Sequence, residues 1–326
     1  MKNILVSGAS GIIGYGILRS LRLFSNDFRS IGTTIYSDSA AEWFCDNFER
    51  AVPTDDDNYI GWLLSIIHKY NIDLIIPGIE ADMYAWFKNK NILEGTGCKI
   101  LLNNDALISL CADKWIFYEA LIKELPEYSI FTSFEKNYDN VVATIGDNFL
   151  IKPRSGHGSK GIIRNPSRQQ FEAIVHSIGK DYIIQPIIGI DDEEYSASLF
   201  GDGKGGFFCS MTLQRKLSKD GYTEKASVYS SQLLLQTLKD LCIFFKPLGP
   251  TNFQFRKDNG YYKLLEINPR ISSATSIRAK FGYNESGMAV NYFLNDIEPN
   301  QPIIKKGRAV RYIEDLIIYE KDCDNI

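Results

Sequence analysis

Residues 3–22, NILVSGASGIIGYGILRSLR, are a short apolar run, three spaced glycines and a segment with helical periodicity. This order is typical of a parallel strand that enters a helix through a tight turn, with Gly8, Gly11 and Gly14 in the turn. A dinucleotide-binding site of the Rossmann type has its glycines here, and Asp38 would be its ribose-binding acid. Glycines also allow close strand-to-helix packing without a ligand. The segment therefore predicts an α/β first domain and leaves dinucleotide binding open.

Short apolar runs alternate with amphipathic helices up to about residue 110. The expected strands contain NILVS, SIGTTIYS, DLIIPG and CKILL, and the expected helices cover 12–23, 58–70 and 80–88. This alternation indicates βαβ units on a parallel sheet. From residue 126 the chain changes to short strands in FLIKP, GIIRN and YIIQP, with a helix expected at 167–178.

Longer runs in the second half indicate antiparallel pairing. They are EYSASLF, GGFFCSMTLQRKL, TNFQFRKD and YYKLLEIN, with a helix expected at 230–246 and a hairpin turn at GDGKGG. The chain therefore combines an α/β with an α+β fold class, and its 326 residues suit two or three domains.

Composition excludes several classes of protein. The net charge of −4 gives no reason to expect a nucleic acid or an anionic membrane as partner. No apolar run reaches the length of a membrane span, and MKNILVSGAS lacks the long apolar region of a secretory signal. The six cysteines are far apart and form no CxxC pair, which is typical of reduced thiols. We therefore expect a cytoplasmic protein.

The segment FLIKPRSGHGSKGIIRN, residues 149–165, combines a lysine with a glycine-rich turn between two strands. Glycines let backbone N–H groups converge on phosphate oxygens, and Lys152 would add a cation at the same place. The segment is not a P-loop, because GxxxxGK[ST] is absent and a strand follows instead of a helix. It predicts a phosphate site, with an ordinary glycine hairpin and a surface lysine as the alternative.

The segment TNFQFRKDNGYYKLLEINPR predicts a metal site. Side chains two residues apart in a strand share a face, so Glu266 and Asn268 point the same way, and Gln254 can lie across from them on the preceding strand. Grouped oxygen ligands suit Mg²⁺, which completes its shell with nucleotide phosphates. The alternative is a structural ion pair between Glu266 and Arg270.

Together these motifs resemble the ATP-grasp superfamily, and within it the large subunit of carbamoyl phosphate synthetase and its single-module relatives. The resemblance covers nearly the whole chain; FQF and EINPR are its most specific motifs, and ADKWIFYEAL, LIKP and YIIQPIIGIDDEEYSASL are further matches. It implies a Rossmann-like pre-ATP-grasp domain at 1–112, a small lid subdomain at 113–186 and a large nucleotide- and metal-binding subdomain at 187–326. The first domain of such proteins is not an NAD site.

The resemblance also implies roles for single residues. Lysines would bind the phosphates below a glycine-rich flap, and the backbone of a hinge strand would contact adenine. The implied nucleotide-binding residues are Lys114, Lys152, Arg154, Ser155, Gly156, Gly158, Ser159, Gly161, Gln185, Pro186, Ile187, Ile188 and Glu194. Glu194 would hold the ribose, with Asp192 or Glu193 as alternatives because the loop after Gly189 is longer than usual. The implied metal ligands are Gln254, Glu266 and Asn268, and the implied catalytic residues are Arg270 and Lys152.

The activity implied by the resemblance is that of an ATP-dependent carboxylate-amine ligase. It would use ATP and Mg²⁺, with Mn²⁺ as an alternative metal, to convert a carboxylate into an acylphosphate that an amine or similar nucleophile attacks. The expected partners are small-molecule carboxylate and amine substrates, and a homodimer is an option for the assembly. Because only one module is present, a full carbamoyl phosphate synthetase reaction is not expected. A nucleotide-binding regulatory protein without turnover and an NAD-dependent dehydrogenase stay open.

Two further groups of residues are candidates for binding a substrate. Glu80 and Asp82 follow the strand in DLIIPG, where they would bind an ammonium group or merely complement a helix dipole. Basic residues that would hold a substrate carboxylate, or form a solvated loop, are Arg215, Lys216 and Lys225.

Overall fold

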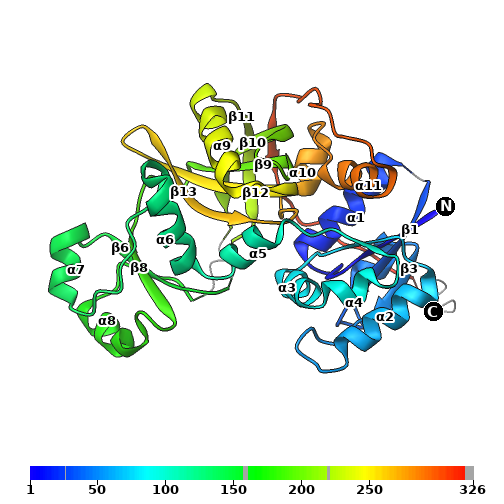
Figure 1. The fold of residues 1–326 in the computed structure, drawn as a ribbon, viewed down its shortest axis with the longest axis horizontal. Helices are drawn as coiled ribbons and strands as arrows, with labels where there is room; N and C mark the ends of the chain where they lie inside the picture. The colour runs from blue at the N-terminus through cyan, green and yellow to red at the C-terminus, as the bar shows by residue number, and fades with distance from the viewer. Residues whose placement is uncertain (26, 157–160, 219–220, 320–326) are drawn as a thin grey trace.

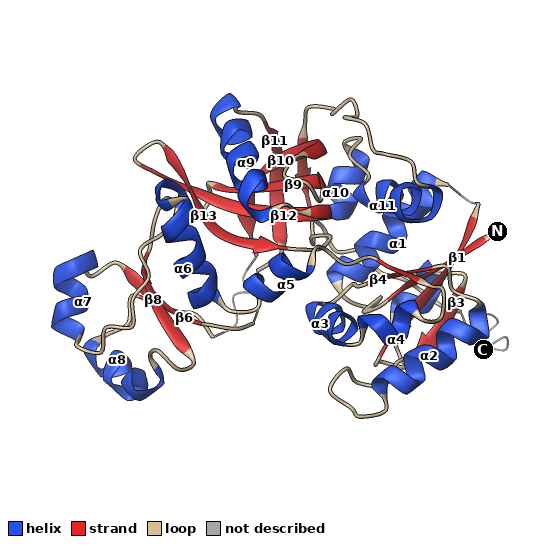
Figure 2. Ribbon diagram, viewed as in Figure 1, coloured by secondary structure: helices blue, strands red, loops and turns tan. Residues whose placement is uncertain are grey.

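The computed structural model describes residues 1–25, 27–156, 161–218 and 221–319, and this part of the chain forms three β-sheets. Figure 1 shows the sheets along the long axis of the molecule, with the six-stranded sheet between the other two. Figure 2 shows helices on the outside of each sheet, and α9 (Gln232–Phe245) lies along the six-stranded one. The mixed architecture confirms the expected combination of α/β and α+β segments.

The first sheet has five parallel strands in the order β3-β2-β1-β4-β5. Its strands are β1 (Lys2–Val6), β2 (Phe28–Thr34), β3 (Asn47–Arg50), β4 (Leu74–Ile76) and β5 (Lys99–Ile100). The helices around it are α1 (Ile12–Phe24), the 3₁₀ helix η1 (Ala40–Phe44), α2 (Tyr59–Tyr70), α3 (Glu80–Lys88) and α4 (Lys90–Glu94). The alternation of strands and helices is therefore the expected one, with β3, η1 and α4 added.

Glycines bring the β1–α1 turn against the β4–α3 turn. Gly8 has a φ of +56°, and a Cβ on Gly14 would lie 2.3 Å from the carbonyl oxygen of Gly8. On the other turn, a Cβ on Gly78 would lie 2.0 Å from the carbonyl oxygen of Ser7. Close packing of two backbones therefore accounts for these glycines without a ligand. Asp38, the acid that a dinucleotide site would use, is exposed.

The second sheet is antiparallel and small, with the order β7-β6-β8. Its strands are β6 (Phe149–Pro153), β7 (Ile163–Arg164) and β8 (Tyr182–Pro186), and its helices are α7 (Tyr138–Ile145), α8 (Arg168–Ile174) and the 3₁₀ helix η3 (Val175–Ser177). A capping box between Ser167 and Gln170 fixes the start of α8. This unit has its own apolar core around Phe149 and Phe171. It is connected to the first sheet through α5 (Asp105–Cys111), α6 (Lys114–Glu124) and the 3₁₀ helix η2 (Pro126–Tyr128).

The third sheet has six antiparallel strands in the order β13-β12-β9-β10-β11-β14. They are β9 (Glu194–Asp202), β10 (Phe207–Leu217), β11 (Thr223–Tyr229), β12 (Leu248–Asp258), β13 (Tyr261–Asn268) and β14 (Arg308–Val310). Alternation along β12 separates two faces. Phe253 and Phe255 pack with α9 in an apolar core, whereas Asn252 and Gln254 belong to the opposite face, which is polar along β12 and apolar farther along the sheet, at Phe200 and Met211. The polar face is the one that the candidate site uses.

Two helices after β13 join the third sheet to the first. Helices α10 (Thr275–Lys280) and α11 (Glu285–Asn295) lie beside α1 in Figure 1. The amide of Asn284 donates to the carbonyl oxygen of Ser20 at 2.7 Å, and a Cβ on Gly16 would lie 3.0 Å from Cγ2 of Thr275. Close contact between small residues therefore docks the two units.

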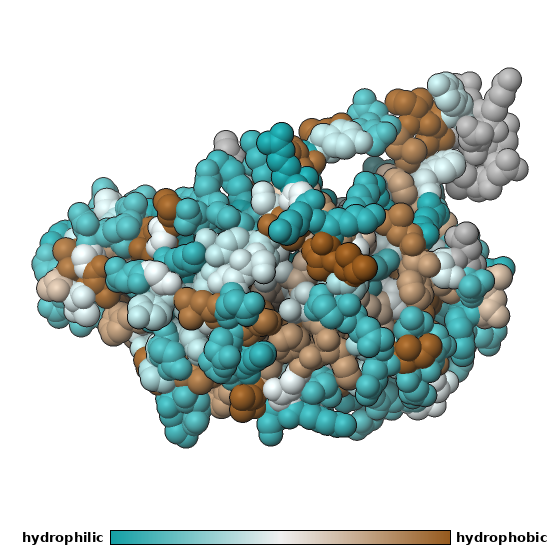
Figure 3. Space-filling model, turned by 90° about the horizontal axis from the view of Figure 1, so that it is seen from above, coloured by the Kyte–Doolittle hydropathy of each residue, from teal (hydrophilic) through white to brown (hydrophobic). Residues whose placement is uncertain are grey.

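The surface is mixed in character, as Figure 3 shows for one face of the molecule. Apolar side chains that are more than two-thirds exposed include Tyr312, Ile313 and Tyr319, all in the segment after β14. None of the helices in the described ranges is both long and apolar enough to cross a membrane.

Candidate functional site

One cavity is bordered by residues from all three units. Its lining includes Glu80 and Tyr84 from α3, Cys111 and Lys114 from α5 and α6, Lys152, Gly156 and Gln185 from the second unit, and Glu266 and Asn268 from β13. Lys114, Lys152, Gly156, Gln185, Glu266 and Asn268 are residues to which the sequence gives a nucleotide or metal role. The structure therefore brings these six together, although they are spread over 155 positions of the chain.

Lys114 is the first residue of α6, and its position is fixed on both sides. The Asp113 side chain caps the helix by accepting from the amide of Trp115, and it also accepts from Arg154 Nη2 at 2.6 Å. Lys114 Nζ donates to the carbonyl oxygen of Gly156 at 2.8 Å. The glycine-rich segment is thereby attached to the N-terminus of α6, where an anion is favoured.

The charges in the cavity influence one another. Burial lowers the pKa of Lys152 to about 8, and the positive charge of Lys114 adds to this effect, against the attraction of Glu266. Burial disfavours the charged form of Glu266, but Lys114, the Asn268 amide and further cations outweigh it, so the pKa of Glu266 lies below its usual value. Glu266 is therefore ionised at neutral pH.

The residues predicted to bind a metal lie at the end of the β12–β13 pair. Gln254 stands opposite Glu266 in the ladder, and Asn268 Nδ2 donates to Glu266 Oε1 at 3.1 Å. Glu266 and Asn268 line the cavity, whereas Gln254 is not among the residues that border it. One carboxylate with amide oxygens is a hard donor set, which fits Mg²⁺ if phosphate oxygens complete the shell. The described residues contain no group of three or more His, Cys, Asp or Glu that could hold a metal alone.

Arg270 pairs with a residue of the first unit. Its Nη2 lies 2.8 Å from Glu80 Oε2 and donates to Asn268 Oδ1 at 2.9 Å. The ion pair observed for Arg270 is thus with Glu80, not the structural pair with Glu266 considered as the alternative. Asp82, two residues after Glu80, is buried and accepts hydrogen bonds from the hydroxyls of Thr54 and Tyr59. It is not among the residues that border the cavity.

The segment predicted to contact adenine, at the end of β8 and just after it, has contacts of its own. Gln185 Nε2 donates to Thr132 Oγ1 at 2.7 Å, and the amide of Ile187, next to Pro186, donates to the Asn148 carbonyl at 2.9 Å. The carbonyl oxygen of Ile188 accepts from Arg256 at 3.3 Å. The backbone contact to adenine stays a prediction.

The residue expected to bind ribose is buried in an ion pair. Glu194 is 3% exposed, and its Oε1 accepts from Arg215 Nη2 at 2.7 Å, so Arg215 is engaged inside the protein. Lys216 lies 3.0 Å from Asp192, which is more exposed. The ribose assignment among Asp192, Glu193 and Glu194 stays a prediction.

Part of the expected glycine-rich flap lies outside the described residues, namely His157, Gly158 and Ser159. Of the rest, Ser155 Oγ donates to the carbonyl oxygen of Ala112 at 3.1 Å, and Gly161 has a φ of +74°. Gly161 thus adopts a backbone conformation that favours glycine.

Several residues that border the cavity were not anticipated, among them Tyr84 and Cys111. Tyr84 follows Glu80 by four residues in α3, so the two share a helix face. That spacing was a usable signal once Glu80 had been singled out. Cys111 ends a short helix whose orientation depends on the contacts of the folded chain, and no local pattern indicates that it borders a site.

Comparisons with known proteins agree with this arrangement. Residues 181–316 match a family described as ATP-grasp in the biosynthetic pathway with Ter operon. The chain is 28% identical over 274 residues to the carbamoyl phosphate synthase large chain of Thermoplasma acidophilum. The matched region covers 75% of this chain and 25% of that protein. The chain thus spans about a quarter of the length of that relative.

Solved structures show the same fold. The N5-carboxyaminoimidazole synthetase of Staphylococcus aureus in complex with ADP superposes with a TM-score of 0.70 at 16% identity, over 93% of this chain and 80% of that one. The biotin carboxylase domain of 2-oxoglutarate carboxylase from Hydrogenobacter thermophilus, in complex with MgADP, ADP and bicarbonate, gives 0.68 at 15% identity, over 94% and 73%. The chain therefore has the fold of these solved enzymes, matches an ATP-grasp family over residues 181–316, and is similar in sequence to the carbamoyl phosphate synthase large chain.

Proposed function

We propose that the chain is an ATP-dependent ligase that activates a carboxylate as an acylphosphate, which an amine or similar nucleophile then attacks with release of phosphate. The observation that carries this proposal is the meeting of Lys114, Lys152, Glu266 and Asn268 at one cavity. Two cations suit the phosphates of ATP, and a carboxylate beside an amide suits the metal that accompanies them.

Each charged residue has a role that follows from its position. Lys114 and Lys152 would hold the phosphates and offset the charge that develops on the β- and γ-oxygens during transfer. Bound Mg²⁺, held by Glu266 with Asn268 and Gln254, would supply further positive charge to those oxygens. Arg270 reaches the same end of β13 and would orient the phosphoryl group or the acylphosphate.

The same positions indicate which unit would bind which substrate. We propose domain boundaries at 1–112, 113–186 and 187–326, with the second and third units enclosing the nucleotide. The first unit contributes Glu80 and Tyr84 to the cavity, so the carboxylate or amine substrate would bind at that side. The relatives of this fold that were solved with ADP or MgADP support a nucleotide site here.

The test is ADP release with ATP and Mg²⁺ across pools of amino acids and small carboxylates, with Glu266→Ala as the control. We expect a particular acid and amine to stimulate ADP release, and we expect Glu266→Ala to abolish the stimulation while its circular dichroism spectrum stays native. Turnover that persists in Glu266→Ala would remove the metal assignment. Nucleotide binding without stimulation by any pool would favour the regulatory protein without turnover.

A further inference from the structure

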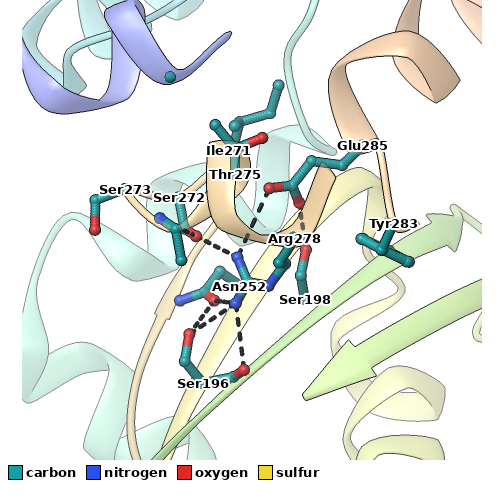
Figure 4. A network of polar contacts seen from close by, with 12 residues as sticks. Ser196, Ser198, Asn252, Ile271, Ser272, Ser273, Thr275, Arg278, Tyr283 and Glu285 are labelled. Atoms are coloured by element: carbon teal, nitrogen blue, oxygen red, sulfur yellow. Dashed lines mark hydrogen bonds and ion pairs between the residues drawn. The ribbon is translucent and has the colours of Figure 1, made fainter. Parts of the chain in front are cut away.

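Arg278 is a fully buried arginine on α10 that the proposed mechanism does not use. Figure 4 shows its guanidinium at the centre of a polar network on the polar face of the third sheet. Nη2 donates to Ser196 Oγ at 2.8 Å and to Asn252 Oδ1 at 2.9 Å, while Nη1 donates to Ser272 Oγ. Its counter-charge is Glu285, with Oε1 3.7 Å from Nη1.

Two of these contacts are with the strand neighbours of predicted metal ligands. Asn252 stands opposite Asn268 in the β12–β13 ladder. Ser196 stands opposite Gln254 in the β9–β12 ladder. Side chains that are directly opposite in an antiparallel pair lie close together. A shift of Asn252 therefore displaces Asn268, and a shift of Ser196 displaces Gln254.

The third contact fixes the chain just after the cavity. Ser272 follows Arg270 by two residues, in the turn that leads from β13 into α10. A planar guanidinium has donors in a fixed fork, so Arg278 holds two strands and this turn at defined mutual positions.

The network is not built for stability alone. Buried ion pairs contribute little net stability, and here the charges are 3.7 Å apart. Arg278 Nε and Asn252 Nδ2 have no hydrogen-bond partner among the described residues. Apolar side chains would fill the same space without unpaired donors, so a role in orienting the neighbouring site accounts better for the arginine.

We propose that Arg278 is a positioning residue, which holds Asn252, Ser196 and the turn at Ser272 so that the metal-binding end of β13 keeps its arrangement. This inference rests on the proposed function, because it assigns a purpose to the order at residues 266–270. A buried charge that orients ligands from behind is comparable to the outer partners of metal sites, whose loss typically costs about 10–100-fold in metal affinity.

Hydrogen exchange tests the positioning itself and needs no ligand. The variants are Arg278→Lys, which keeps the charge but loses the fork, and Ser272→Ala, which removes the contact with Arg278 together with the bond that Ser272 Oγ accepts from the amide of Ala274. Ser20→Ala is the matched control, since Ser20 is equally buried but donates within α1 to the Gly16 carbonyl. We expect faster exchange of amides at 252–254 and 266–272 in both variants and native exchange there in the control. If Arg278→Lys fails to fold, Ser272→Ala decides the question.

Calorimetry of ADP binding with and without Mg²⁺ tests the consequence for the site. We expect Arg278→Lys and Ser272→Ala to weaken the Mg²⁺-dependent part of ADP binding by about tenfold and to leave metal-free ADP binding close to native. A purely structural role would lower the melting temperature without this split. Native exchange together with native Mg²⁺ dependence in folded variants would overturn the inference. If the native protein does not bind ADP in the presence of Mg²⁺, the proposed function fails. The exchange data still decide the role of Arg278 in that case.

Discussion

Lys152 and Glu266 illustrate what single residues contribute to the cavity. Glu266 stays ionised, whereas burial destabilises the protonated form of Lys152 beside it. The cavity therefore has more positive than negative charge, and its cations lack some of the negative partners that would stabilise them. An entering polyphosphate would supply the missing negative charge. It would favour the protonated form of Lys152 and thus raise the pKa of that lysine when bound.

The first prediction concerns the pH dependence that follows. The pKa of Lys152 is about 8 in the free protein, so below that pH the amine already carries its proton and binding gains nothing from further acid. As the pH rises through 8, binding must take up a proton, so ADP affinity should fall by up to about tenfold per pH unit. Calorimetric titrations with ADP between about pH 7 and 9.5 measure this slope.

Lys152→Arg is the informative variant, because arginine stays protonated throughout this range. We expect the ADP affinity of Lys152→Arg to stay constant between about pH 7 and 9.5. Lys136→Arg, at an exposed lysine of the second unit, should show the same change of ADP affinity with pH as the native protein. An equal slope in native protein and Lys152→Arg would show that another group titrates.

At the residue scale, spacing predicted some contacts and missed others. Glu266 and Asn268 are two apart in a strand, and their side chains do meet. Arg270 and Glu80 are separated by 190 positions, and nothing in either segment indicates the partner. Local periodicity fixes which way a side chain points from its own element, whereas an ion pair between units depends on how whole sheets dock.

At the scale of elements, long periodic segments were predictable and short edge strands were not. The sequence patterns agree with helices α1, α2, α3 and α9 and with strands β1, β2, β4, β9, β10, β12 and β13. β11, with charged residues in TEKASVY, and β14, with only three residues, were missed. β14 is the edge strand of the sheet, and β11 lies between it and β10, so the strand character of both comes from their neighbours and not from their own composition. The basic residues for which a solvated loop was the alternative lie in strands, with Arg215 and Lys216 in β10 and Lys225 in β11.

The second prediction tests the contact between α1 and α10. A Cβ on Gly16 would be 3.0 Å from Cγ2 of Thr275, which is tight for a single methyl group and too close for a branched side chain. Gly16→Val should therefore lower the free energy of unfolding by about 1–3 kcal/mol through overpacking. Denaturant titration followed by circular dichroism measures the change.

Gly61 in α2 provides the matched control, because a Cβ there meets nothing within 4 Å. Gly61→Ala should raise the free energy of unfolding by about 0.5–1 kcal/mol through helix propensity. A Gly16→Val variant as stable as the native chain would mean that the two helices separate easily.

At the scale of the whole molecule, the cavity exists only because three units meet. The sequence indicated each unit from its own pattern, but the border that α3 provides, with Glu80 and Tyr84, depends on the docking of α1 against α10 and α11. The Arg270–Glu80 pair crosses this border, with side chains that are 8% and 13% exposed. It therefore links the end of β13, where the predicted metal ligands lie, to the first unit.

The last prediction measures this link by a double-mutant cycle. Glu80→Gln leaves Arg270 mostly buried without that carboxylate, so the free energy of unfolding should fall by about 1–3 kcal/mol. Arg270→Met should cost a similar amount. The double variant should cost less than the sum, because the attraction between the two charges is already lost in either single variant, and the difference is the coupling energy between the units. Lys90→Gln breaks the exposed pair with Asp105 and should change stability by less than about 1 kcal/mol. Additive losses in the cycle would mean that Glu80 and Arg270 act independently, and that the other contacts between the units, such as those of α1 with α10 and α11, hold the first unit at the cavity.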